Sequence, residues 1–158
     1  MSDSTPEFPP ATLAKRLLAI VYDLLLLTAL LFAVGVVVAG VLTFAVNNGN
    51  AITEEHPFYY TSQLIILSVM LCASYLFFGW FWVHGGQTLG MKTWCIKLTT
   101  IDNKNISWKQ ATIRFFVAIF SWLIVGQGFI RSLFDKEKRT RHDIQSGTKL
   151  IQLDKRKS

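Results

Sequence analysis

The sequence predicts an α-helical integral membrane protein with two long transmembrane helices, a third, shorter membrane-embedded segment and a small cytoplasmic β element. Hydrophobic residues make up 51% of the 158 positions and charged residues only 16%, which is more apolar than ordinary soluble proteins. The apolar residues are concentrated in three blocks, and the segments between them hold nearly all the charge. The 16 Lys and Arg residues, against 10 Asp and Glu, are unevenly distributed, which indicates an orientation in the membrane.

Two of the apolar blocks are long enough to cross a bilayer as helices. Leu17 to Val46 contains one charged residue, Asp23, and Phe58 to Val83 contains none. Both blocks exceed the roughly 20 residues that are needed to cross about 30 Å of hydrocarbon. Aromatic residues lie at both ends of the second block, as in the belts that mark membrane interfaces.

The third apolar block, Phe115 to Ile130, is shorter and is flanked by Arg114 and Arg131. Its 16 residues would cover only about 24 Å as a straight helix. Three arrangements are therefore open: a thin crossing, a helix lying in the interface, or a re-entrant hairpin.

Local patterns around this block predict a small sheet and a helix start. Thr93 to Thr100 is rich in β-branched residues, and Thr148 to Leu153 alternates like a strand; we expect the two to pair on the cytoplasmic side. Ser107 and Gln110 form a capping box that starts a helix at Trp108.

These patterns divide the chain into a tail, a membrane domain and a short basic end. Residues 1–13 contain three prolines and are expected to form a flexible tail. The expected membrane domain covers 14–153 and is followed by the basic tail 154–158. Within the domain we expect helices at 17–46 and 58–83, a strand and turn at 92–107, the third apolar segment at 108–134, and a basic segment with a strand at 135–153.

The positions of Lys and Arg predict the orientation. Two precede the first helix, none lies in the connection 47–57, four lie between His84 and Ile113, and nine follow Ile130. Because positive charge marks the cytoplasmic side, we expect both termini to be cytoplasmic and the third block to enter the membrane without crossing it. Three full crossings are the alternative.

Asp23 is the leading functional candidate, since an ionisable residue within hydrocarbon is costly without a partner or a purpose. Arg16 lies seven residues earlier on the same helix face. Tyr75 is a candidate hydrogen-bond donor to Asp23, and Arg114 is a candidate counter-charge. The carboxyl group could fix helix packing or take part in ion movement.

The sequence offers no catalytic, metal or cofactor motif, so we expect no enzyme activity. Cys72 and Cys95 have no metal-ligand spacing. The segment GGQTLGMKT at 85–93 lacks the contiguous Gly-Lys-Thr of a phosphate loop. A juxtamembrane basic patch more often binds anionic lipid headgroups than nucleic acid, and here it comprises Lys136, Lys138, Arg139 and Arg141.

These motifs together resemble the RDD family, bacterial membrane proteins named for one arginine and two aspartates. Arg16 and Asp23 in AKRLLAIVYDLLL match the family's first helix, Arg114 matches an arginine of a later helix, and Asp143 in KRTRHDIQSGT is the second aspartate. Met91, between Gly90 and Lys92, departs from the family pattern. The resemblance implies a multi-pass protein of the inner membrane and a role in transport.

Two functions follow as hypotheses. The chain is a small ion or solute transporter, or part of one, and acts as a homo-oligomer, because two or three helices cannot enclose a path. Alternatively, it is a non-catalytic membrane scaffold or assembly factor that binds anionic lipid or a partner protein through its basic face.

Overall fold

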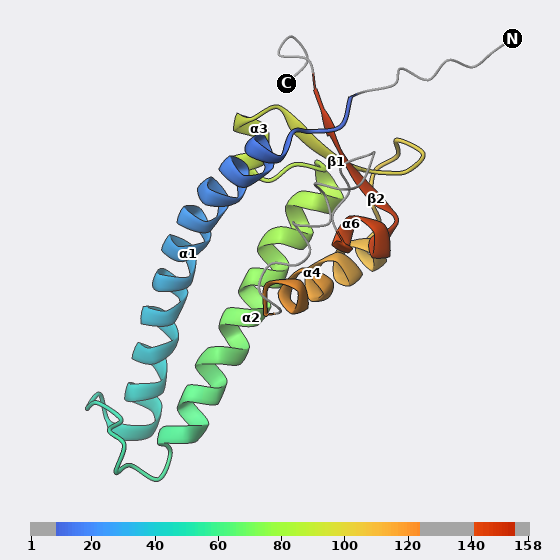
Figure 1. Ribbon diagram of the computed structural model, residues 1–158. Helices are drawn as coiled ribbons and strands as arrows, with labels where there is room; N and C mark the ends of the chain where they lie inside the picture. Colours follow the sequence, from blue (N-terminus) through green and yellow to red (C-terminus); the bar gives the residue numbers. More distant parts are fainter. Residues whose placement is uncertain (1–8, 124–140, 154–158) are drawn as a thin grey trace, which may run out of the picture. The chain divides into compact units, whose positions relative to one another are not determined.

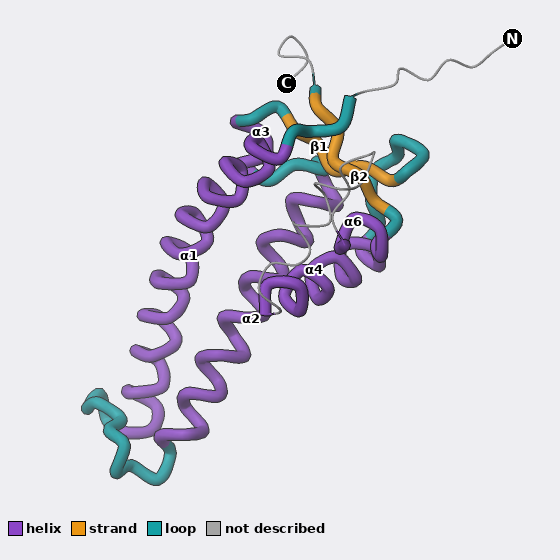
Figure 2. Tube along the Cα trace, viewed as in Figure 1, coloured by secondary structure: helices purple, strands orange, loops and turns teal. Residues whose placement is uncertain are grey.

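The computed structural model describes residues 9–123 and 141–153 (Figures 1 and 2). The chain divides into two compact units, one formed by Leu25–Phe77 and the other by the segments on either side of it. The described elements, in chain order, are α1 Leu13–Asn47, α2 Tyr59–His84, α3 Leu89–Thr93, β1 Ile96–Thr100, α4 Trp108–Leu123, α6 Arg141–Ser146 and β2 Thr148–Gln152.

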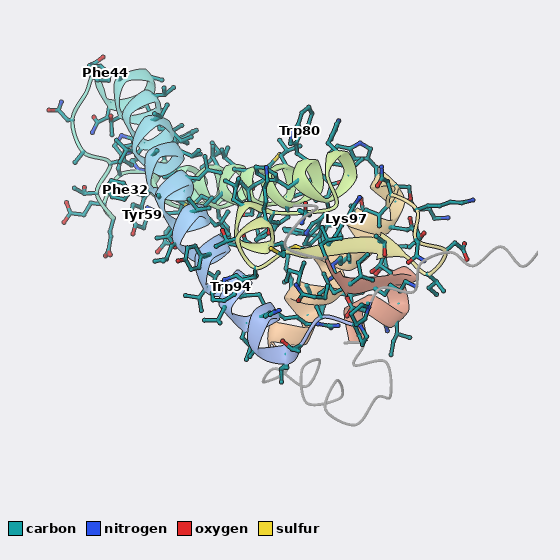
Figure 3. The ribbon with its side chains drawn as sticks, turned by 90° about the horizontal axis from the view of Figure 1, so that it is seen from above. Phe32, Phe44, Tyr59, Trp80, Trp94 and Lys97 are labelled. Atoms are coloured by element: carbon teal, nitrogen blue, oxygen red, sulfur yellow. The ribbon has the colours of Figure 1, made fainter. Side chains whose placement is uncertain are left out.

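Helices α1 and α2 are long and apolar enough to cross a membrane, as the two long apolar blocks predict. No residue in the most apolar 18-residue stretch of α1 is buried, and only 6% of the corresponding stretch of α2 is. The core helix of a soluble protein would bury most of such a stretch. Phe32 and Phe44 on α1 are 74% and 75% exposed and point away from the helix (Figure 3). Side chains of this kind need an apolar solvent.

The Leu25–Phe77 unit is a helical hairpin. The Cε methyl of Met70 on α2 lies 2.8 Å from the ideal Cβ position of Gly35 on α1, so the absent side chain lets the helices approach. The backbone turns after α1 through positive φ angles at Asn48 and Gly49, and the amide of Gly49 donates to the carbonyl of Thr43 at 2.9 Å. This bond satisfies a carbonyl at the helix end.

In the other unit, β1 and β2 lie side by side as an antiparallel pair (Figure 1), which is the pairing that the sequence predicts for these two segments. Leu98 is opposite Leu150, and Lys97 is opposite Ile151. The buried residues of the two strands include Ile96, Leu98, Leu150 and Ile151. This small sheet forms the core onto which α3, α4 and α6 are arranged.

The segment Pro9–Ala11, expected within the flexible tail, is ordered against β2. The amide of Gln152 donates to the carbonyl of Pro9 at 2.8 Å, and the amide of Ala11 donates to the carbonyl of Leu150 at 3.0 Å. The proline-rich composition was misleading here, because proline keeps its carbonyl acceptor and is tolerated beside an edge strand. Residues 1–8 of the expected tail lie outside the described residues.

Helix α4 starts at Trp108, as the capping box predicts. The amide of Ser107 donates to Gln110 Oε1 at 3.0 Å, and the amide of Gln110 donates to Ser107 Oγ at 3.3 Å. Both bonds satisfy amides that have no acceptor within the helix. The described helix ends at Leu123, and residues 124–134 of the expected third apolar segment lie outside the described residues.

Candidate functional site

Three buried charged side chains meet where α1, α4 and α6 come together. Arg16 Nη1 donates to Asp143 Oδ2 at 3.2 Å, and Arg114 Nη1 donates to Asp143 Oδ1. Asp143 is 0% exposed, Arg16 3% and Arg114 5%. We refer to these three residues as the charged latch.

Both arginines of the latch have further fixed contacts. Arg16 Nε donates to the carbonyl of Ala11 at 3.1 Å, and Arg114 Nη1 donates to Thr148 Oγ1 at 3.0 Å. The Arg114 guanidinium also lies over the ring of Trp82, 5.4 Å from its centroid, where the ring face attracts a cation. The latch therefore connects both long helices to the small sheet.

The charge balance of the latch depends on Asp143. Within the described part of the chain, two buried guanidinium nitrogens, Arg16 Nη2 and Arg114 Nε, have no hydrogen-bond partner. A buried cation is strongly destabilising when its counter-charge is removed. The Asp143 carboxylate lies against both cations, so it compensates two buried charges at once.

Asp23 forms a second buried site at the start of α3. Its Oδ2 accepts a hydrogen bond from Thr88 Oγ1, and its Oδ1 accepts one from the amide of Gly90 at 2.9 Å. Thr88 is the N-cap of α3, and its hydroxyl accepts from the amide of Met91 at 3.2 Å. The carboxylate thus satisfies donors that the first turn of a helix leaves free. We refer to this arrangement as the Asp23 cap.

Gly90 makes the Asp23 cap possible, because a side chain there has no room. An ideal Cβ would overlap the carbonyl oxygen of Ala19 and would lie 2.9 Å from Asp23 Oδ1. The glycine-rich segment 85–93, which superficially resembles a phosphate loop, therefore binds an anionic group through the Gly90 amide. That anion is the carboxylate of Asp23, on α1.

Comparison with known proteins identifies the family. Residues 10–147 match the RDD family, and the match covers most of the chain. The chain belongs to the RDD family. No curated protein and no solved structure matches it. The family and the two long apolar helices together indicate a membrane protein.

The resemblance described in the sequence analysis assigns the family's arginine and two aspartates to Arg16, Asp23 and Asp143, and all three lie in these two sites. Arg16 and Asp23 share one buried face of α1 with Ala19, as their seven-residue spacing predicts. Asp143, the second aspartate, is the centre of the charged latch. The three residues fasten the first turns of α1 to the folded unit that contains α3, α4 and α6.

One of the expected pairings is corrected by the geometry: Arg114 pairs with Asp143 and not with Asp23. The Asp23 carboxylate accepts from Thr88 and Gly90, and the expected hydrogen bond from Tyr75, which lies in the Leu25–Phe77 unit, stays a prediction. The sequence does carry a signal for the observed partners, since Thr88 is a good N-cap residue and begins a short helix. The N-cap pattern at Thr88 does not show which acidic side chain, far away in the sequence, binds at the start of α3.

The remaining site predictions stay untested. Lys136, Lys138 and Arg139 of the basic patch lie outside the described residues, and Arg141 is described only as the first residue of α6. Within residues 9–123 and 141–153, no group of three His, Cys, Asp or Glu residues could hold a metal ion.

Proposed function

We propose that this RDD protein is a non-catalytic membrane scaffold. Its two long helices anchor a small folded unit at the membrane surface, and that unit binds anionic lipid or a partner protein through its basic face. One observation carries the proposal: both signature carboxylates are buried and bound by fixed donors within the chain.

The geometry of Asp23 favours anchoring over ion exchange. A carboxylate that loads and unloads an ion must exchange its partners during each cycle. One donor to Asp23 is a backbone amide, and the other is a threonine hydroxyl that also caps α3. Releasing Asp23 would therefore leave the Gly90 amide, in the first turn of α3, without its acceptor.

Transport is the second candidate, and the position of Asp23 favours it. The residue lies in a helix apolar enough to span a membrane, where ionisable side chains often mark ion pathways. A role in transport is also what membership of the RDD family implies. Two or three helices cannot enclose a transport path, and the sequence has no inverted repeat that would form the second half of one. A transporter of this size would therefore act as a homo-oligomer.

The proposed location is the bacterial inner membrane, with both termini cytoplasmic. Nine of the 16 Lys and Arg residues follow Ile130, and the positive-inside rule places that segment in the cytoplasm. A reporter that is active only in the cytoplasm, fused after Ser158, is expected to give signal. Signal from a periplasm-specific reporter at the same site would contradict this orientation.

Asp23→Asn separates the two candidate functions. Asparagine can accept from the Gly90 amide and donate to Thr88 Oγ1, so we expect a loss of only about 1 kcal/mol in the free energy of unfolding. Asp23→Ala leaves both groups unsatisfied and should cost about 1 to 3 kcal/mol for each. The measurements are thermal unfolding in detergent and ion flux into liposomes under a panel of gradients.

A scaffold predicts no flux for the unmodified protein, and unchanged recovery of bound lipid or partner for Asp23→Asn. Neutralising Lys136, Lys138, Arg139 and Arg141 with glutamine should reduce that recovery instead, because each basic residue near an anionic surface contributes about 1 kcal/mol. Flux in the unmodified protein that disappears in well-folded Asp23→Asn protein would replace the scaffold with a carrier.

A further inference from the structure

The two faces of the β1–β2 sheet carry different kinds of side chain. In an antiparallel pair, residues directly opposite each other share a face, and so does every second residue of a strand. Leu98 and Leu150, which are opposite each other, therefore share one face with Thr148. That face packs against α4, since Thr148 Oγ1 accepts from Arg114 Nη1 at 3.0 Å. The other face carries Lys97, Thr99, Lys149 and Ile151.

Thr99 is buried on this second face without a polar partner. It is 3% exposed, and its hydroxyl group has no hydrogen-bond partner within the described residues. A buried hydroxyl is rarely left in this state, because nothing compensates for its lost hydrogen bonds to water. The Thr99 hydroxyl can donate one hydrogen bond, so the second face holds an unused donor.

Both lysines of the second face are neighbours of Thr99. Lys149 is directly opposite Thr99, and the Cβ atoms of such a pair lie about 5 Å apart. Lys97 is two residues from Thr99 on the same strand, which is about 7 Å. Neither lysine forms an ion pair within residues 9–123 and 141–153. Two ammonium groups and one buried donor therefore lie together without an anion to bind.

The stem of Lys97, which is labelled on β1 in Figure 3, is supported by Gly86. An ideal Cβ at Gly86 would lie 2.9 Å from Lys97 Cε and 3.2 Å from Lys97 Cγ. The carbonyl of Gly86 accepts from the amide of Leu98 at 2.7 Å, which holds this glycine beside β1. The apolar stem of Lys97 is thus packed against the edge of the sheet, and its ammonium group remains for an anion.

We propose that Lys97, Thr99 and Lys149 bind a phosphate group, and we refer to these three residues as the Thr99 site. Two ammonium groups offset the negative charge of a phosphate, and the threonine hydroxyl donates to one of its oxygens. The flexible lysine stems rotate to let the phosphate reach Thr99. The inference rests on the proposed function, because it names the chemical group that the basic face binds. That phosphate belongs either to an anionic lipid headgroup or to a soluble compound.

Two titrations of the full chain in neutral maltoside micelles test the site and distinguish the two sources of phosphate. Phosphatidylglycerol is added in one titration, and sodium phosphate at constant ionic strength in the other. A ligand that binds the folded state raises the unfolding temperature, which gives an apparent affinity in each. Binding of the lipid alone assigns the site to a headgroup, and binding of inorganic phosphate assigns it to a soluble compound. Binding of neither would overturn the inference.

Lys97→Gln combined with Lys149→Gln is expected to weaken this binding about 30-fold, because both ammonium groups are lost. The matched control combines Lys104→Gln with Lys109→Gln, which removes the same charge from exposed positions of the same unit. The control should change the affinity less than about threefold, since exposed charges are screened by salt. Equal losses in the two double variants would show that binding follows net charge, and the Thr99 site would be wrong.

Thr99→Val removes the hydroxyl group and keeps the shape of the side chain. Without ligand, the variant is expected to unfold at a higher temperature than the unmodified protein, because a buried hydroxyl without a partner is replaced by a methyl group. Its affinity for the ligand should fall about fivefold. Unchanged affinity in Thr99→Val protein would overturn the inference. Ion flux in liposomes would end the scaffold without changing these titrations, so the two failures are distinguishable.

Discussion

Replacing Asp143 with alanine is expected to destabilise the protein more than any other single change in the two buried sites. The substitution leaves Arg16 and Arg114 buried at 3% and 5% exposure without the carboxylate that compensates them. Breaking one buried ion pair typically costs about 3 to 5 kcal/mol, and here two pairs lose a shared partner. Because total stabilities are about 5 to 15 kcal/mol, we expect little folded protein in detergent, measured by thermal unfolding and by size-exclusion chromatography.

Asp102→Ala is the matched control. Asp102 is exposed, in the turn between β1 and α4, and a surface change of this kind usually alters stability by about 0.5 kcal/mol or less. If Asp143→Ala protein unfolds at the same temperature as the Asp102→Ala control, the latch does not stabilise the fold.

The second large effect is expected for Gly90→Ala. A methyl group at this position meets the backbone carbonyl of Ala19 and the carboxylate of Asp23, and a backbone atom cannot rotate away as a side chain can. Overpacking usually costs about 1 to 3 kcal/mol and sometimes more; we expect the upper end, since the Asp23 cap is lost as well. The free energy of unfolding in mixed micelles measures the change.

Gly40→Ala is the control for the glycine substitution. Gly40 also lies in a helix, α1, but nothing lies within 4 Å of its ideal Cβ position. Alanine in an open helical position is more stable than glycine by about 0.5 to 1 kcal/mol, so the control should be neutral or slightly stabilising. A loss of stability in Gly40→Ala as large as that in Gly90→Ala would remove the steric explanation.

The elements that depend on local sequence were predictable. Long apolar runs gave the positions of α1 and α2 to within a few residues, because hydrocarbon thickness sets a minimum length. The Ser107 and Gln110 capping box gave the first residue of α4, since both of its bonds join residues three apart. β-Branched residues located β1 and an alternating pattern located β2. The structure starts β1 at Ile96 and not at the expected Thr93, because Thr93 is the last residue of α3.

The partners of the buried charges were not predictable in this way. Asp23 and Thr88 are 65 residues apart, and Arg16 and Asp143 are 127 apart. The sequence identifies side chains that need a partner, but several arrangements satisfy Asp23 equally well before the fold is known. The assignment of Arg114 to Asp23 was wrong because β2 and α6 bring Asp143 beside α4, and the pairing of these distant segments is a tertiary feature.

A double-mutant cycle on Arg16 and Asp143 tests the central claim, that these two residues fasten the first turns of α1 to the folded unit. The free energies of unfolding of Arg16→Met, Asp143→Asn and the double variant are measured in mixed micelles against the unmodified protein. Residues that act as one latch should couple, so the double variant is expected to lose less stability than the sum of the single variants, by about 1 to 3 kcal/mol. Losses that add to within about 0.5 kcal/mol would contradict the latch.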